Sequence, residues 1–281
     1  CAEQKRMGKW LTKSKILAYS QEKPSIDEYF SFFDDKYYLS FWEKDELDTK
    51  EYYFIEQLYS PDVKHYKYGT KYLANYIPLF NSEEEFNQLC YKCGARDECE
   101  MQREAGIPKA FDCIATKAIT INEKGDKFGS SMLGILKADV DHLGFIFSLG
   151  LEKKMSISRY LTLSRMMDFF FSGYIYQTLS KKYQNIYTVY SGGDDLFLIS
   201  DWETMIQFAK EMYSDFREFT CKNIDITLSS GITAIKPKFP IRRGADIVSE
   251  LLEDSKNHGR DRITLFNTIV KWQDLTELFQ L

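Results

Sequence analysis

The sequence has neither an excess of basic charge nor a long apolar run, and both absences narrow its class. Its 37 Lys and Arg are outnumbered by 42 Asp and Glu, which leaves a net charge of −5. Proteins that coat nucleic acid usually carry net positive charge, so the overall charge gives no sign of that class, although a local basic patch remains compatible with it. No apolar run approaches the roughly 20 residues that a membrane span needs. We therefore expect no membrane segment.

Cysteine is scarce as well, with six in 281 residues. Because no secretory signal accompanies them, the cytoplasm is the expected compartment. The chain begins at Cys1 rather than at a methionine, and we expect it to be a piece of a longer protein. Its content of hydrophobic (44%) and aromatic (16%) residues supports a sizeable core and two domains rather than one.

One short stretch, TVYSGGDDLFLIS at residues 188–200, combines two apolar runs with two glycines and two adjacent acids. Runs rich in β-branched and aromatic residues around a Gly-containing break predict a β-hairpin. Gly192 and Gly193 can take the positive φ angles of a tight turn and leave room for a ligand near the backbone. Asp194 and Asp195 repel each other, and a divalent cation such as Mg²⁺ or Mn²⁺ would relieve that cost. The alternative at this point is a solvated acidic turn.

The pattern of elements around this hairpin predicts an α+β fold. A strand is expected at 132–140, a long, mostly apolar helix at 156–183, the hairpin at 185–200, a helix capped by Asp201, a strand at 224–235, a helix at 245–252 and a last strand at 262–266. The first six elements match βαββαβ, the ferredoxin-like arrangement of polymerase and cyclase palms, and an extra αβ follows. We expect a palm domain at residues 119–281, preceded by a smaller mixed linker or adaptor domain at residues 1–118.

The ferredoxin-like order places the end of the first palm strand beside the GGDD turn. The stretch ILKADVDHLG ends that strand with Asp139 and Asp141. Asp139, Asp194 and Asp195 could then form one carboxylate cluster of the kind that holds two metal ions about 4 Å apart. Such a pair activates a 3′-hydroxyl and binds the triphosphate of a nucleotide. This cluster is the predicted catalytic site.

A third stretch, SKNHGRDRITLF, places Lys256, Arg260 and Arg262 at a helix end and in the strand that follows. Lys256 and Arg260 are four residues apart and could donate charge-assisted hydrogen bonds to phosphate oxygens. The alternative is a helix C-terminus that ends at Gly259 with favourable basic charge in its last turn.

The cysteines of CYKCGARDEC raise a separate hypothesis. Cys90, Cys93 and Cys99, together with Cys113, could form a tetrahedral Zn²⁺ site, although the spacing to the third ligand is short and irregular. Free thiols in a loop are the alternative.

Taken in order, ILKADVDHLG, YSGGDDLFLIS and DSKNHGRDRITLF resemble the second palm domain of the large signature subunit of type III CRISPR effector complexes, closest to the Csm (III-A) kind. That family is distantly related to GGDEF diguanylate cyclases. Upstream, KYLANYIPLF resembles the segment before this palm, and the first residues, CAEQKRMGKWLTKSK, resemble the end of the family's zinc-bearing domain.

The resemblance implies an antiviral enzyme that condenses ATP into cyclic oligoadenylate when its complex binds target RNA. It implies metal ligands at Asp139, Asp194 and Asp195, with the Val140 carbonyl as a further ligand. Nucleotide contacts would come from Ser191, Gly192, Gly193, Lys256 and Arg260. The implied partners are the other subunits of the effector complex, crRNA, target RNA and the first palm of the same full-length subunit.

Two departures from the family leave other functions open. The family's HD nuclease domain is not found, since none of the three histidines forms an HD pair in that order. Its active site lies between two palms, and only one is recognisable here. A diguanylate cyclase is a second reading, although the string is GGDDLF rather than GGDEF. A palm that acts only as a structural scaffold is the third.

Overall fold

The computed structural model describes residues 10, 13–32, 35–44, 47, 52, 54–58, 67–71, 75–94, 99, 104–148 and 156–278. The chain divides into two compact units, residues 1–73 and residues 74–281. The predicted division at residues 118 and 119 stays a prediction about domain organisation. None of the helices described is long and apolar enough to cross a membrane.

The first unit contains a five-stranded sheet with the order β2-β3-β1-β4-β5. Its central strand β1 pairs antiparallel with β3 and with β4. Leu17, Phe41 and Leu58 form its small core. The strands of this unit are β1 (Ile16–Ser20), β2 (Tyr29–Phe32), β3 (Tyr37–Trp42), β4 (Phe54–Leu58) and β5 (Gly69–Lys71).

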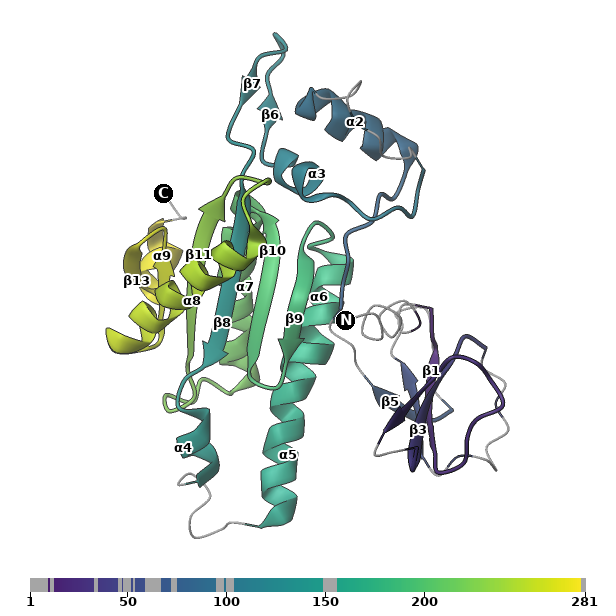
Figure 1. Ribbon diagram of the computed structural model, residues 1–281. Coiled ribbons are helices and arrows are strands. Elements are labelled where there is room, and N and C mark those ends of the chain that lie inside the picture. Colours follow the sequence, from purple (N-terminus) through teal and green to yellow (C-terminus); the bar gives the residue numbers. More distant parts are fainter. Residues whose placement is uncertain are drawn as a thin grey trace. The chain divides into compact units, whose positions relative to one another are not determined.

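The second unit is built on a six-stranded sheet with the order β13-β12-β11-β8-β10-β9 (Figure 1). Strand β8 is central and pairs antiparallel with both β10 and β11, whereas β12 joins β11 in parallel. The strands are β8 (Leu133–Val140), β9 (Tyr187–Gly192), β10 (Asp195–Asp201), β11 (Leu228–Ile235), β12 (Arg262–Leu265) and β13 (Thr268–Lys271).

Helices cover both faces of this sheet, which explains why β8 is apolar without interruption over its first half. Leu133 and Ile135 belong to the core cluster that contains Val248 of α8 (Ile241–Asn257). Leu136 and Ala138, which alternate with them, belong to the larger cluster formed with α7 (Trp202–Phe219). By the same alternation Asp139 lies on the α8 face.

The predicted long helix is a continuous helical path with a change of winding. It consists of α5 (Ile157–Asp168), a π-helical segment (Phe169–Tyr174) and α6 (Ile175–Lys181). A helix that is apolar on most faces is expected to be buried between layers, and Phe170, Ile175 and Leu179 are buried. The expectation of burial is wrong for Leu161, Met166 and Phe169, which are 45%, 46% and 45% exposed. Periodicity identified an apolar helix, but the described residues of this chain cover only its C-terminal half.

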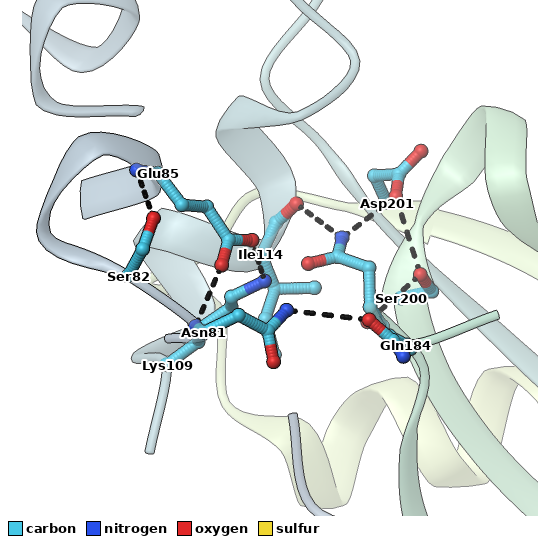
Figure 2. Close-up of polar contacts among 9 residues, drawn as sticks. Asn81, Ser82, Glu85, Lys109, Ile114, Gln184, Ser200 and Asp201 are labelled. Atoms are coloured by element: carbon cyan, nitrogen blue, oxygen red, sulfur yellow. Dashed lines mark hydrogen bonds and ion pairs between the residues drawn. The ribbon is translucent and has the colours of Figure 1, made fainter. Parts of the chain in front are cut away.

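Two smaller helices, α2 (Glu83–Cys93) and α3 (Phe111–Thr116), precede the sheet, followed by the short hairpin β6 (Thr120–Ile121) and β7 (Lys127–Phe128). Figure 2 shows the polar contacts that hold this region to the far end of β10. Asn185 donates from Nδ2 to the Ile114 carbonyl (3.1 Å) and to Asp201 (2.8 Å). Asn81 donates to Gln184 across the same junction (3.2 Å). The helices α2 and α3 are therefore anchored at the end of the sheet opposite the GGDD turn.

Within residues 132–281, three short elements were not predicted from the sequence. They are α4 (Leu143–Ser148), which follows the strand β8, and the pair of β13 and α9 (Trp272–Leu278) at the C-terminal end. Each is 4–7 residues long, too short for hydrophobic periodicity to distinguish from a loop.

Candidate active site

The GGDD turn lies beside the end of β8, as the predicted element order requires. Asp195 begins β10 and is the register partner of Asp139 on β8. The Val140 amide donates to the Asp194 carbonyl at 3.1 Å, which fixes the turn against the strand end. Three carboxylates, two on adjacent strands and Asp194 in the turn, are thus brought to one end of the sheet, while the Val140 side chain is buried.

The turn itself is shaped by Gly193 and by an acid that sequence reasoning missed. Gly193 has φ +68°, a left-handed conformation that favours glycine. Its amide donates to Asp168 Oδ1 (3.3 Å), which also accepts from the Ser172 hydroxyl (2.9 Å). Asp168 is the last residue of α5, directly before the π-helical segment. Its only signal in the sequence was an acid within an otherwise apolar helix.

The hydroxyl of Ser191, predicted to bind nucleotide, has a different partner in the structure. Ser191 is buried, and its Oγ donates to the Phe171 carbonyl in the π-helical segment at 2.6 Å. Together with Asp168, this contact joins the hairpin to the helix. The structure therefore gives Ser191 a role in positioning the turn, and its contact with nucleotide stays a prediction.

The three carboxylates share an environment that opposes their ionisation. Burial raises the pKa of Asp195, and the negative charge of Asp139 raises it further. Burial also raises the pKa of Asp194, and the neighbouring Asp195 adds to the effect. Each acid therefore makes the next harder to ionise, which is the electrostatic condition that a bound cation relieves.

Lys256 forms an ion pair with one of these acids. Its Nζ lies 2.7 Å from Asp139 Oδ2, and the two side chains are 21% and 24% exposed. Burial lowers the pKa of Lys256, but the hydrogen bond and charge of Asp139 outweigh it, so that the pKa is raised overall. For Asp139 burial is the largest cause and raises its pKa, against the opposing effect of Lys256. The lysine predicted to bind the triphosphate is in place beside the acids.

Asp141, two residues beyond Asp139, has a different environment. Its carboxylate is buried and accepts hydrogen bonds from Thr227 (2.8 Å), Ser229 (2.7 Å) and the amide of Asp261 (3.0 Å). These donors tie β8 to β11 and to the loop before β12. Asp141 is therefore a structural acid, occupied by the protein's own donors.

Arg260, the other predicted phosphate ligand, lies at the end of α8. Its Nη1 donates to the Lys256 carbonyl at a long 3.4 Å, and its φ is +58°. This contact fits the helix-capping alternative. The long hydrogen bond leaves the guanidinium free to take a better acceptor, so its phosphate contact stays a prediction.

The acids fit a hard divalent cation in their chemistry, although they are not preassembled around one. Carboxylate oxygen is the ligand that Mg²⁺ and Mn²⁺ prefer. Within the described ranges no group of three or more His, Cys, Asp or Glu side chains is arranged to hold a metal ion. Lys256 instead serves as the counter-charge of Asp139.

The cysteines of the zinc hypothesis lie near one another around α2 and α3. Cys90 is buried in a small cluster with Phe80 and Phe86, and Cys113 packs against it. Burial raises the pKa of Cys113 to about 11, and the charges of Cys99, Cys90 and Cys93 contribute. The four thiols are thus neighbours. Among the described residues, however, they are not arranged to hold a metal ion.

Comparison with known proteins identifies the domain that carries this site. Residues 132–264 match the family model of the Cas10/Cmr2 second palm domain. The protein named CRISPR system single-strand-specific deoxyribonuclease Cas10/Csm1 (subtype III-A) from Methanocaldococcus jannaschii is 37% identical over 185 residues, 58% of this chain and 22% of that protein. The protein of the same name from Streptococcus thermophilus is 36% identical over 157 residues, 54% of this chain and 20% of the relative. The matched region thus spans about a fifth of these relatives.

Solved structures share the fold. A Csm1–Csm4 subcomplex of the type III-A CRISPR-Csm interference complex aligns with a TM-score of 0.71 and 21% identity over 100% of this chain and 38% of that one. A Csm1–Csm4 cassette in complex with one ATP aligns with a TM-score of 0.67 and 22% identity, over 95% of this chain and 36% of that one. Residues 132–264 are therefore similar to the Cas10/Cmr2 second palm domain, and over this region the chain resembles Cas10/Csm1 proteins of subtype III-A.

Proposed function

We propose that this chain is the nucleotidyl cyclase palm of a type III-A effector complex and makes cyclic oligoadenylate from ATP. The observation that supports it best is the pairing of Asp139 with Asp195, next to Asp194 and Lys256. The finer ferredoxin-like assignment is supported by the order β11-β8-β10-β9, in which the first strand and the hairpin are neighbours. Solved Csm1–Csm4 cassettes carry ATP and cA3, which favours adenine nucleotides.

In this proposal the three carboxylates bind Mg²⁺ or Mn²⁺, with the Val140 carbonyl as a further ligand. When bound, the metals lower the pKa of the attacking 3′-hydroxyl and neutralise the departing pyrophosphate. Asp139, Asp194 and Asp195 hold the negative charge that recruits the cations. Asp168 and Ser191 keep the turn in position through Gly193 and Phe171. Lys256 donates to the triphosphate, and Gly192 and Gly193 leave room for it.

The proposed partners follow from the family. Solved Csm1 chains occur with Csm4, and we propose that this chain assembles with a subunit of that kind, with crRNA, target RNA and the first palm of its own full-length subunit. The cytoplasm is the proposed compartment.

Replacing both turn acids tests the proposal most directly. In the assembled complex with target RNA, Asp194→Ala with Asp195→Ala should reduce oligoadenylate synthesis by at least a hundredfold, because the metal ligands are lost. Product is measured by chromatography of labelled ATP. Asp225→Ala, which removes an exposed acid of the same chain, should leave the rate unchanged. Synthesis at the normal rate by the double variant would refute the assignment.

Two alternatives make different predictions in a binding titration with Mn²⁺. Preference for GTP over ATP would favour the diguanylate-cyclase reading, and binding of neither nucleotide in the assembled complex would favour a scaffold. The proposal expects selective binding of ATP.

The zinc hypothesis is tested separately by thiol labelling. Without zinc, iodoacetamide at pH 8 should modify exposed Cys93 first and Cys113 last, because the pKa of Cys113 is raised to about 11. A bound zinc would protect Cys90, Cys93, Cys99 and Cys113 together until a chelator is added. Peptide mass spectrometry separates the two outcomes, and exposed Cys221 serves as the internal control.

A further inference from the structure

A cationic pocket lies where α7, the loop before β12, β12, β13 and α9 meet. It has a volume of about 310 Å³, and its lining includes Arg260, Arg262 and Lys271. Volumes of this order accommodate small ligands. Among the described residues that line it, Asp261 is the one acid. Three cations thus face one carboxylate in a chain whose overall charge is negative.

The single acid is already occupied by the protein. Asp261 Oδ1 accepts a hydrogen bond from the Tyr213 hydroxyl at 2.8 Å. Burial and this hydrogen bond raise the pKa of Tyr213, so the phenol remains a donor at neutral pH. The backbone amide of Asp261 donates to Asp141 at 3.0 Å, which fixes the loop. Asp261 is therefore held to α7 rather than directed to the cations.

Two of the cations face each other across a strand pair. Arg262 on β12 is the register partner of Lys271 on β13. Like charges placed directly opposite in an antiparallel pair destabilise it, since the side chains are close. An arrangement with this cost is expected where an anion binds between the two side chains.

The guanidinium of Arg262 is also incompletely satisfied. Its Nε is buried and has no hydrogen-bond partner among the described residues. Gly259, with φ +113°, lies against it, and a Cβ at that position would come within 3.2 Å of Nη2. Any other residue would be strained there and would press on the guanidinium. The glycine thus makes room for the arginine at the edge of the pocket.

We propose that this pocket binds a phosphate group of a nucleotide or of an oligonucleotide chain, between Arg262 and Lys271. Arginine and lysine donate charge-assisted hydrogen bonds that suit phosphate oxygens. The two proposed phosphate ligands, Arg262 and Lys271, are not among the residues proposed for the cyclase site, although Arg260 also lines the pocket, and binding between them needs no metal. It therefore stands or falls independently of the proposed cyclase activity.

The experiment uses the 281-residue chain in low salt with EDTA, so that metal-dependent binding at the GGDD turn is suppressed. ATP and the trinucleotide ApApA, which has internal phosphodiesters but no terminal phosphate, are the two probes. Binding is followed by calorimetry and by the shift in melting temperature. A response to ATP alone identifies a terminal phosphate, and a response to ApApA identifies a chain phosphate. Either supports the site only if it depends on Lys271.

The variant Lys271→Glu tests whether binding depends on Lys271. It should raise the melting temperature without ligand, because it places an acid opposite Arg262, and it should weaken binding at least tenfold. Lys124→Glu makes the same charge change at an exposed position outside the pocket and should leave binding unchanged. Arg262→Met, which keeps the aliphatic volume, should also weaken binding. If neither probe binds, or if Lys271→Glu binds as tightly as the unmodified chain, the proposal is wrong.

Discussion

Strand β10 begins and ends with an aspartate, and the two carboxylates have opposite surroundings. Asp201, at the end that carries α7, accepts from the Thr204 amide (2.9 Å), from Asn185 (2.8 Å) and from Ser200 (3.2 Å). Asp195, at the other end, faces Asp139 and follows Asp194. Asp201 is surrounded by donors, whereas Asp195 has two acids beside it and a hydrogen bond from the Tyr190 side chain.

The difference separates a carboxylate that the protein satisfies from one that it does not, within a single strand. A buried carboxylate that its own protein satisfies fully has little reason to bind a cation. A carboxylate whose neighbours raise its pKa gains from one. By this criterion Asp141 belongs with Asp201, since three donors satisfy it. The two ends can therefore be tested against each other by substitution.

The largest effect on stability is expected at the donor-rich end. Asp201→Ala removes the N-cap of α7 and leaves the buried amide of Asn185 without one of its acceptors. Together these losses should lower the free energy of unfolding by about 2–4 kcal/mol. Urea unfolding followed by circular dichroism measures the change.

The matched control for Asp201 is Glu203→Ala, an exposed acid in the first turn of the same helix. It should cost only a few tenths of a kcal/mol through the helix dipole. Equal losses for the two variants would contradict the view that Asp201 is a structural acid.

A smaller effect, on ligand affinity rather than on stability, is expected for Lys256→Ala. The variant should weaken ATP binding in the assembled complex by about 1–3 kcal/mol, the range of a hydrogen bond to a charged group. The pair with Asp139 is partly exposed, so its loss should change the melting temperature little. Calorimetric titration with ATP and a thermal melt provide the two numbers.

Lys222→Ala is the control for Lys256, because Lys222 pairs with Glu218 on an exposed helix face. Lys222→Ala should change neither the affinity for ATP nor the melting temperature. A Lys256→Ala variant with unchanged affinity and a lower melting temperature would instead favour the helix-end role of this lysine.

The order of the palm elements could be predicted because each has a strong local signal. Asp201 is a good N-cap, and β8 reads as a buried strand that ends in acids. Bounds were less accurate: the predicted helix 245–252 extends over Ile241–Asn257, and the strand predicted from Ile224 begins at Leu228. Helix α8 begins after Pro240, with no side-chain cap to mark its start.

Contacts between distant segments were beyond the reach of the sequence. No local pattern indicates that Asp168 accepts from Gly193, because 25 residues separate them. The same holds for the inward hydroxyl of Ser191, whose partner is the Phe171 carbonyl. The positions of the aspartates and the expected strand order predicted that Asp139 would lie beside the GGDD turn. Which donors each acid finds depends on packing that only the folded chain defines.

The smallest expected effect is a dependence of stability on pH at the acid-rich end. The pKa of Asp195 is raised in the folded chain, so the folded state binds more protons than the unfolded state between pH 4 and the raised value. The free energy of unfolding should therefore fall as the pH rises through that window. Asp195→Asn keeps an acceptor for Tyr190 but no charge, and it should be more stable than the unmodified chain at pH 7 and no more stable at pH 3. Melting temperatures between pH 3 and 8, without divalent metal, measure this difference, with Asp225→Asn as the control at an exposed acid.

Added Mg²⁺ should raise the melting temperature of the unmodified chain more than that of Asp195→Asn, because the cation relieves the repulsion that the substitution has already removed. If Asp195→Asn is instead destabilised at pH 7 to the same extent as at pH 3, Asp195 is a satisfied acid like Asp201, and the contrast between the two ends of β10 does not hold.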